Sequence, residues 1–169
     1  INRAHLKYLG TGMDDLEANT ARVQLEGLLD TLRDAKEYGS ILKVEGYNWE
    51  LLRRFVSAAD AGTQISLDSA GLEVTSEQLL TLIDITETMG RKYDVVVTNP
   101  PYAGTAKLSD KLNGKVKLDY PNSKSDLSTV CMERAIAMLK KHGYMTMINI
   151  PVWMFLSSYA KMREDIVNH

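Results

Sequence analysis

A β-branched run, Tyr93-Asp94-Val95-Val96-Val97-Thr98, ends directly at Asn99 and a pair of prolines. A continuous run of this kind is typical of a parallel strand that is covered on both faces. Proline cannot donate to a sheet ladder, so the strand has to end where Pro100 begins. The run therefore predicts a strand whose carboxyl end presents Asn99 and Tyr102 at the rim of a sheet, where open α/β folds bind their ligands.

The residues after this run predict a second strand and the helix that leads to it. Apolar residues recur at helical spacing from 127 to 139, and we expect this helix to be capped by Ser123 or Ser125 and to stop at Gly143. Residues 144–150 predict the second strand. Strand, helix and strand in this order form a βαβ unit, which predicts an α/β fold with a mainly parallel sheet.

The 90 residues before this unit are predicted to be mostly helical, and residues 91–169 to hold the βαβ unit. The expected helices lie at 14–38, with a stop near Gly39; at 48–59, with an N-cap at Asn48; at 75–90, with a capping box from Thr75 to Gln78; and at 157–167. Residues 41–44 predict a short strand, and residues 103–122 have no period and predict a long functional or disordered loop.

Composition narrows the possible functions. The chain has 169 residues, 44% of them hydrophobic, and a formal net charge of −2, so it has the composition of a globular protein without a global basic field. Any contact with DNA must therefore be local. The single Cys131 excludes an internal disulfide and a thiolate zinc cluster, and it is consistent with a reducing cytoplasm. Because the first residue is Ile1 and not Met, we expect a segment of a longer protein.

The stretch from Asp94 to Tyr102 resembles the catalytic motif of adenine-specific DNA methyltransferases that use S-adenosylmethionine. Two further sequence segments, from Tyr120 to Leu127 and from Trp153 to Tyr159, are similar to the large bacterial methyltransferases of the PglX type. Those methyltransferases belong to BREX-like phage-exclusion systems. The resemblance covers residues 20–167. It implies a class I, Rossmann-like methyltransferase domain, S-adenosylmethionine as cofactor, DNA as partner, and a role in restriction-modification or phage defence.

The chemistry of methylating an adenine amino group explains the residue types in the tetrapeptide. The amino nitrogen is a poor nucleophile because its lone pair is delocalised into the ring. If the Asn99 side-chain oxygen and the Pro100 carbonyl each accept one of its hydrogens, the lone pair is freed and the growing positive charge is stabilised. Pro101 stiffens the turn, and Tyr102 is placed to stack on a base swung out of the duplex. The alternative is a stiff turn in which Asn99 bonds its own backbone and Tyr102 fills a surface groove.

A cofactor-binding motif is harder to find. The only glycine-rich candidate is Gly10-Thr11-Gly12, which lacks the acidic residue that should follow at the end of a second strand. A simple turn at the entry of a helix is the favoured interpretation. We therefore expect the main cofactor-binding motif to lie outside this chain, and the cofactor-binding residues stay unknown.

Several charged and aromatic residues near the tetrapeptide have two possible roles. The lysines that could hold DNA phosphates, or could be solvated surface residues, are Lys107, Lys111, Lys115, Lys117 and Lys124. Asp126 is expected to be a cap-region acid rather than a catalytic one. Trp153 and Phe155 could line a base pocket, although core packing is favoured.

Two functional alternatives stay open at this point. The same tetrapeptide chemistry would serve an N-methyltransferase that acts on RNA or on protein glutamine. A non-catalytic module that binds DNA or a partner protein in a restriction or phage-exclusion complex is a second alternative. A piece of a larger fold could also expose apolar surface, which predicts self-association. The three histidines lack metal-ligand spacing, and no metal is expected.

Overall fold

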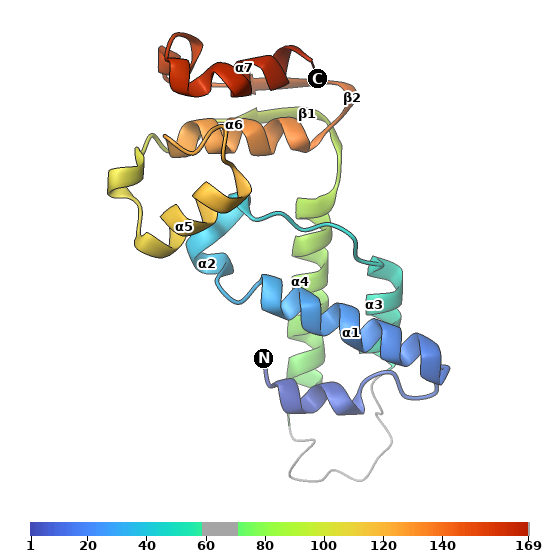
Figure 1. Ribbon diagram of the computed structural model, residues 1–169. Coiled ribbons are helices and arrows are strands. Elements are labelled where there is room, and N and C mark those ends of the chain that lie inside the picture. Colours follow the sequence, from blue (N-terminus) through green and yellow to red (C-terminus); the bar gives the residue numbers. More distant parts are fainter. Residues whose placement is uncertain (59–70, 169) are drawn as a thin grey trace. The chain divides into compact units, whose positions relative to one another are not determined.

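The structure, a computed structural model, describes residues 1–58 and 71–168. The chain, drawn in Figure 1, divides into two compact units. The first unit comprises Ile1–Arg33 and Lys43–Gly90, and the second comprises Asp34–Leu42 and Arg91–His169. None of the described helices is long and apolar enough to cross a membrane.

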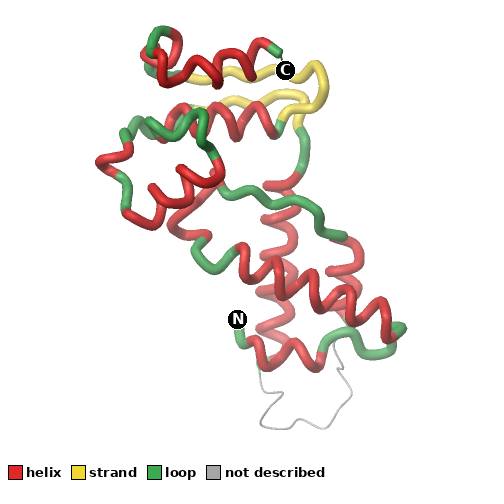
Figure 2. The backbone as a smooth tube through the Cα atoms, in the orientation of Figure 1, coloured by secondary structure: helices red, strands yellow, loops and turns green. Residues whose placement is uncertain are grey.

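In the described part of the first unit all regular elements are helices, joined by loops, as the tube in Figure 2 shows. Its elements are the 3-10 helix η1 (Arg3–Tyr8) and the helices α1 (Asp15–Thr31), α3 (Trp49–Ser57) and α4 (Leu72–Gly90). Helix α3 packs against both α1 and α4. The fully buried core side chains include Leu25, Leu28, Leu52, Phe55, Leu79 and Ile83.

Of the helix caps predicted in this unit, the structure confirms one and contradicts another. The Asn48 side chain accepts a hydrogen bond from the Leu51 amide, so the predicted N-cap of α3 is confirmed. The predicted capping box at Thr75 is wrong, because α4 already begins at Leu72 and Thr75 is buried within it. Its hydroxyl lies 2.8 Å from Nδ1 of His5, a partner from a distant part of the sequence. The predicted helix end at Ala59 lies outside the described residues.

The second unit contains a parallel two-stranded sheet, β1 (Tyr93–Thr98) and β2 (Leu139–Met147). The chain between the strands forms the 3-10 helix η3 (Thr105–Lys107) and the helices α5 (Asp110–Asp119) and α6 (Leu127–Ala137). After β2 follow η4 (Pro151–Met154), η5 (Ser157–Tyr159) and helix α7 (Ala160–Val167). The predicted βαβ unit with parallel strands is confirmed. The unit also holds helix α2 (Ala35–Tyr38) and η2 (Gly39–Ile41), so the predicted stop near Gly39 is confirmed and the predicted strand at 41–44 is wrong.

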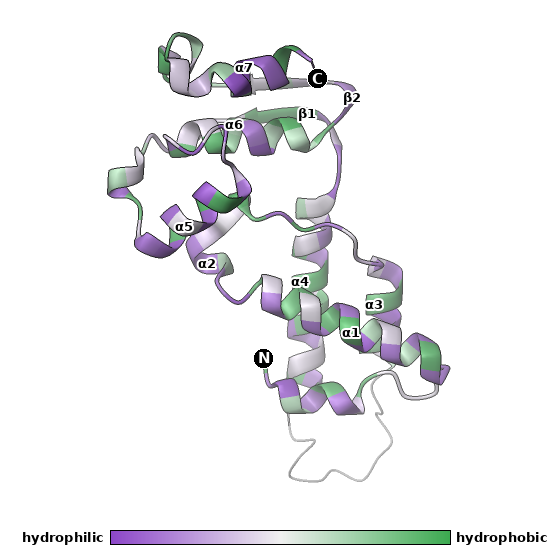
Figure 3. Ribbon diagram, in the orientation of Figure 1, coloured by the Kyte–Doolittle hydropathy of each residue, from purple (hydrophilic) through white to green (hydrophobic). Residues whose placement is uncertain are grey.

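One face of this small sheet is covered and the other is open. Met145 and Met147 of β2 pack against a buried cluster that combines Met132 of α6, Tyr159 of η5 and Met162 of α7. On the opposite face, Val95 is 56% exposed, Val97 71% and Tyr144 77%. Figure 3 shows β1 largely in the green of hydrophobic residues. The prediction of a strand covered on both faces is therefore wrong for this chain, since the described helices pack on one face only.

The end of the crossover differs from the sequence expectation. Helix α6 ends at Ala137, and Gly143 lies within β2 instead of ending a helix. The pairing register jumps there, from Tyr93 opposite Leu139 to Val95 opposite Tyr144. A Cβ on Gly143 would lie 3.1 Å from the carbonyl oxygens of Tyr93, Asp94 and Lys140. The glycine therefore allows a close backbone approach at an irregularity of the sheet.

The segment predicted to be a long loop is largely helical. Helix α5 occupies half of it and η3 a further part, and the Ser109 hydroxyl caps α5 by accepting from the Leu112 amide at 3.2 Å. The helix is anchored from the side, because Lys111 forms an ion pair with Asp34 and Ser109 also bonds Glu37. Its only fully buried residue is Val116, so the sequence carries too little apolar periodicity to reveal it.

Candidate active site

The predicted tetrapeptide lies at the rim where the two strands of the second unit end. Thr98 is the last residue of β1, and its carbonyl accepts a hydrogen bond from the Ile148 amide just after β2. Asn99 and Tyr102 are exposed, whereas Pro100 is buried. Pro100 holds the turn on the protein while the side chains of both candidate residues, Asn99 and Tyr102, stay accessible from solvent.

The side chains of Asn99 and Tyr102 contact each other. The Tyr102 hydroxyl donates toward Oδ1 of Asn99 at 3.2 Å and toward the carbonyl oxygen of Ile148 at 3.0 Å. A hydroxyl carries a single hydrogen, so the two acceptors share it. Among the described residues, the Asn99 amide oxygen thus pairs with the tyrosine and not with its own backbone, which argues against a merely self-bonded turn. The role of the Ile148 carbonyl was not predicted, because a backbone acceptor leaves no signature in the sequence.

The residues that directly follow the tetrapeptide are hydrogen-bonded to the start of α6. The Ala103 carbonyl accepts from the Leu127 amide at 2.8 Å, and Gly104 forms an isolated antiparallel bridge with Asp126. Asp126 is the N-cap of α6, since its carboxylate accepts from the Ser128 amide at 2.9 Å and from the Ser128 hydroxyl at 2.6 Å. The prediction of a cap-region acid is confirmed.

Ser123 and Ser125 do not cap α6, so that prediction is wrong. Ser123 is buried, its hydroxyl donates to Glu133 at 2.6 Å, and its carbonyl accepts from the Thr129 hydroxyl. Ser123 therefore supports the first turns of the helix from the side. This leaves the cap position to Asp126, whose carboxylate accepts hydrogen bonds from the amide and the hydroxyl of Ser128.

The rim offers hydrogen-bond acceptors and an aromatic face. The carboxamide oxygen of Asn99 and the backbone carbonyl of Pro100 are consecutive acceptors, and the ring of Tyr102 is 45% exposed. Among the described residues, no group of His, Cys, Asp and Glu side chains could hold a metal ion. The arrangement can bind a flat ring that carries an amino group, hold both amino hydrogens and leave the nitrogen lone pair free.

The five lysines predicted to meet phosphates fall into two groups. Lys111 forms an ion pair with Asp34, and Lys115 pairs with Asp119 at 3.0 Å. Lys107, Lys117 and Lys124 are exposed, and the structure shows no carboxylate paired with them within the described part of the chain. The second group is therefore the one that offers uncompensated charge.

The two aromatic residues after β2 have different environments. Trp153 is half-buried and packs against the buried cluster of Met132, Tyr159 and Met162, so core packing is confirmed for it. Phe155 is 78% exposed, so core packing is wrong for this side chain. Its segment leaves the sheet from the same edge as the tetrapeptide, because both follow the carboxyl end of a parallel strand.

The Gly10 turn serves the helices of the first unit. The Gly10 amide donates to the Phe55 carbonyl at 2.9 Å, and the Thr11 amide donates to the Ala58 carbonyl at 2.7 Å. Gly10 has a φ of 76°, and a Cβ there would lie 2.5 Å from the Phe55 ring. The turn thus closes on α3 and leads into α1. Since the Gly10 and Thr11 amides already have partners and the 3-10 helix η1 precedes the turn, the turn does not fit the cradle of a nucleotide-like cofactor.

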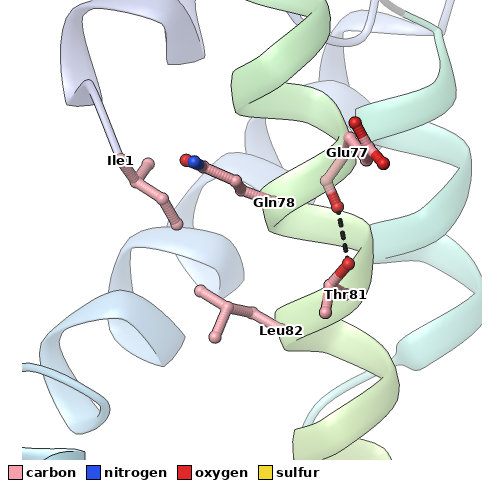
Figure 4. Close-up of a pocket in the computed structure, with 5 residues that line it drawn as sticks. All are labelled: Ile1, Glu77, Gln78, Thr81 and Leu82. Atoms are coloured by element: carbon pink, nitrogen blue, oxygen red, sulfur yellow. Dashed lines mark hydrogen bonds between the residues drawn. The ribbon is translucent and has the colours of Figure 1, made fainter.

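A pocket of 410 Å³ in the first unit contains none of the predicted site residues. It is lined by Ile1, Glu77, Gln78, Thr81 and Leu82, and Figure 4 shows four of these side chains on the same helix, α4. The Thr81 hydroxyl donates to the Glu77 carbonyl at 3.0 Å, as the dashed line marks. This leaves one carboxylate and one amide along an open helix face, which is no constellation for catalysis.

Comparison with known proteins connects the rim to a family. Residues 15–169 match the Eco57I restriction-modification methylase family. The chain is 35% identical over 142 residues to the adenine-specific methyltransferase PglX of Lacticaseibacillus casei (strain Zhang), which covers 83% of the chain and 12% of that protein. It is 33% identical over 155 residues to the adenine-specific methyltransferase BrxX of Escherichia coli O9:H4 (strain HS), which covers 90% of the chain and 13% of that protein. The chain thus spans a small part of the length of these relatives.

Proposed function

This chain belongs to the family of Eco57I restriction-modification methylases, and from that premise we propose that it carries the target-base site of an enzyme that methylates the N6 amino group of adenine in DNA. The observation that carries the proposal is the contact of Asn99 with Tyr102 at the carboxyl end of β1. An amide acceptor and an exposed aromatic ring stand side by side there. Both relatives named above are described as adenine-specific methyltransferases.

The role of Asn99 and Pro100 is to hold the amino group of the flipped base. Oδ1 of Asn99 and the Pro100 carbonyl oxygen each accept one hydrogen from the adenine amino nitrogen. The nitrogen becomes more tetrahedral, so its lone pair is available to form the new bond to carbon. Positive charge grows on the nitrogen as that bond forms, and both acceptors then bind it more strongly than they bind the neutral amine.

The role of Tyr102 is to receive the face of the base. An adenine inside a duplex is inaccessible, so the base has to leave the stack before it reaches the rim. Stacking on an aromatic side chain is worth about 1–3 kcal/mol per base, which offsets part of the lost stacking in the duplex. Exposed Phe155, which leaves the sheet from the same edge, is proposed as a second wall of this base pocket.

S-adenosylmethionine would supply the methyl group as part of a sulfonium ion. The one glycine-rich turn of the chain does not fit this cofactor, because the Gly10 and Thr11 amides are bonded to α3. We therefore assign to this chain the side of the reaction that binds the base, and assign the cofactor to residues outside it. In this proposal residues 91–169 are part of a Rossmann-like class I methyltransferase domain, and residues 1–90 are a helical segment that precedes its catalytic strand.

DNA phosphates are proposed to meet Lys107, Lys117 and Lys124. These lysines are exposed, and Lys107 and Lys124 lie close in sequence to the two ends of the segment 104–126, which the bridge between Gly104 and Asp126 brings together. Lys111 and Lys115 are secondary candidates, since each would have to leave a carboxylate partner to bind a phosphate. The biological setting that we propose is restriction-modification or phage defence, with other proteins of such a system as partners.

The test of the proposed function is the Asn99→Ala variant in the complete natural protein that carries this chain. Loss of one transition-state hydrogen bond should lower the rate of methyl transfer by about 100- to 1,000-fold. The measurement is incorporation of labelled methyl groups into adenine of DNA from a host that lacks the enzyme. Asn19→Ala is the matched control, because Asn19 is exposed on α1 of the other unit, and this variant should keep the full rate.

The outcome also separates the alternatives. If Asn99→Ala methylates DNA at the rate of the natural protein, the proposed base site is wrong. Labelled RNA or protein glutamine in place of labelled adenine would point to another N-methyltransferase. Retained DNA binding with no methyl transfer by the natural protein would identify a non-catalytic DNA-binding module.

A further inference from the structure

Resting on the proposed function, we propose that the hydroxyl of Tyr102 closes the base site when no base is bound. The hydroxyl does so by donating to Asn99 and to Ile148, which lie at the ends of the two strands. Tyr102 would then have two opposite effects on base binding. Its ring favours the bound base, and its hydroxyl favours the empty site.

The Tyr102 hydroxyl and the target amino group share one acceptor, the side-chain oxygen of Asn99. Oδ1 of Asn99 is the atom proposed to accept a hydrogen of the target amino group, and the Tyr102 hydroxyl already lies 3.2 Å from it. A hydrogen-bonded amino nitrogen would need to lie at about 2.7–3.2 Å from the same oxygen. The oxygen has two lone pairs, but the hydroxyl occupies one of the directions from which the amino group can approach.

The second bond ties the ring to the neighbouring strand. The Ile148 carbonyl accepts from the same hydroxyl at 3.0 Å, and Ile148 directly follows β2. The ring is therefore held against the ends of both strands while its face is only partly exposed. In this proposal, a base that stacks on this face and also reaches Oδ1 displaces the hydroxyl from at least one of its acceptors.

The size of the effect follows from the exposure of the site. The hydroxyl exchanges protein acceptors for water when it is displaced, so the net cost is that of a typical exchange of hydrogen bonds in water. A net hydrogen bond corresponds to about a 3- to 10-fold change in an equilibrium constant. Removal of the hydroxyl with retention of the ring should therefore favour base binding by this factor.

The experiment is the Tyr102→Phe variant in the complete natural protein, assayed for methyl transfer to DNA from a host that lacks the enzyme. The expected result is a KM for DNA that falls about 3- to 10-fold, with kcat changed by less than about 2-fold. Tyr102→Ala should raise the KM, because it removes the ring as well as the hydroxyl. Tyr144→Phe is the matched control, since Tyr144 is an exposed tyrosine on the open sheet face, and it should leave both constants unchanged.

The two proposals fail in different ways. A KM for Tyr102→Phe that stays the same or rises overturns the closing role of the hydroxyl, and a fall in kcat shows that the hydroxyl assists the reaction instead. In either case a large loss of activity in Asn99→Ala still supports the proposed base site. If Asn99→Ala is fully active, the base site itself is wrong, whatever Tyr102→Phe does.

Discussion

Burial raises the pKa of two side chains that lie near the start of α6. Cys131 is partly buried, and burial, followed by the negative charge of Asp126, raises the pKa of its thiol above the ordinary value of 9.0. Burial likewise raises the pKa of the Tyr120 phenol above its ordinary value of 10.0. The Tyr120 hydroxyl donates to the Ile41 carbonyl, which requires the protonated form. Both groups are thus held neutral by the fold.

This predicts a loss of stability at alkaline pH. In the unfolded chain the thiol and the phenol ionise at their ordinary values, so the unfolded state loses protons first as the pH rises. The stability contributed by the neutral forms is present below pH 9.0 and falls above it. Denaturant unfolding of this chain between pH 7 and pH 10.5 should show a free energy of unfolding that falls as the pH rises. In the Cys131→Ala variant the free energy of unfolding should fall less steeply with pH just above pH 9.0. A free energy that is constant over this range would contradict the prediction.

At the scale of single residues, the sequence predicted the position of Asn99 and Tyr102 at the rim better than their contacts. Asn99 and Tyr102 were found from their place after a hydrophobic strand, and the structure brings their side chains together. The carbonyl of Ile148 was missed, because main-chain atoms are the same in every residue. The exposure of Phe155 was missed, because a large aromatic residue is more often buried than not.

At the scale of elements, the irregularity in β2 depends on Gly143. Three carbonyl oxygens lie 3.1 Å from the position of a Cβ on this residue, and all three belong to backbone. Backbone cannot rotate away as a flexible side chain can, so an added methyl group has to push β1 and β2 apart locally.

Gly143→Ala is therefore expected to lower the free energy of unfolding by about 1–3 kcal/mol, the usual cost of overpacking. The measurement is denaturant unfolding followed by circular dichroism. Gly114→Ala is the matched control, because Gly114 lies inside α5 with open space around its Cβ position. Alanine is favoured over glycine in a helix, so the control should be unchanged or slightly stabilised. Equal stability of the two variants would show that the strands accommodate the methyl group.

The elements that the sequence predicted best are those with a strong local signal. The β1 strand, the cap of α3 at Asn48 and the parallel βαβ order all follow from periodicity and capping residues. Helix α5 was missed because polar residues and Gly114 hide its period, and its anchors on Asp34 and Glu37 are distant in sequence. The start of α4 was missed because the partner of Thr75 is His5, at the other end of the unit's sequence.

For the whole molecule, the binding of S-adenosylmethionine tests our proposal that the cofactor is bound by residues outside this chain. The amides of the Gly10 turn are engaged with α3, and the chain covers 12% and 13% of the two relatives. Calorimetric titration should therefore show binding by the complete natural protein and none of comparable affinity by residues 1–169 alone. Comparable affinity in both would place the cofactor site within this chain and overturn our assignment of the cofactor to residues outside it.

The bridge between Gly104 and Asp126 affects how far the segment between them can vary in length and sequence. Together with the bond from the Leu127 amide to the Ala103 carbonyl, it brings the two ends of the excursion over 104–126 to one point. Lengthening a loop whose ends are already joined adds only about 0.6 kcal/mol of entropy cost for each doubling of its length. The excursion can therefore change in length or sequence between relatives while the spacing between Asn99 and Tyr102 stays the same. Relatives of this chain can thus differ in the segment beside the tetrapeptide while the tetrapeptide itself stays unchanged.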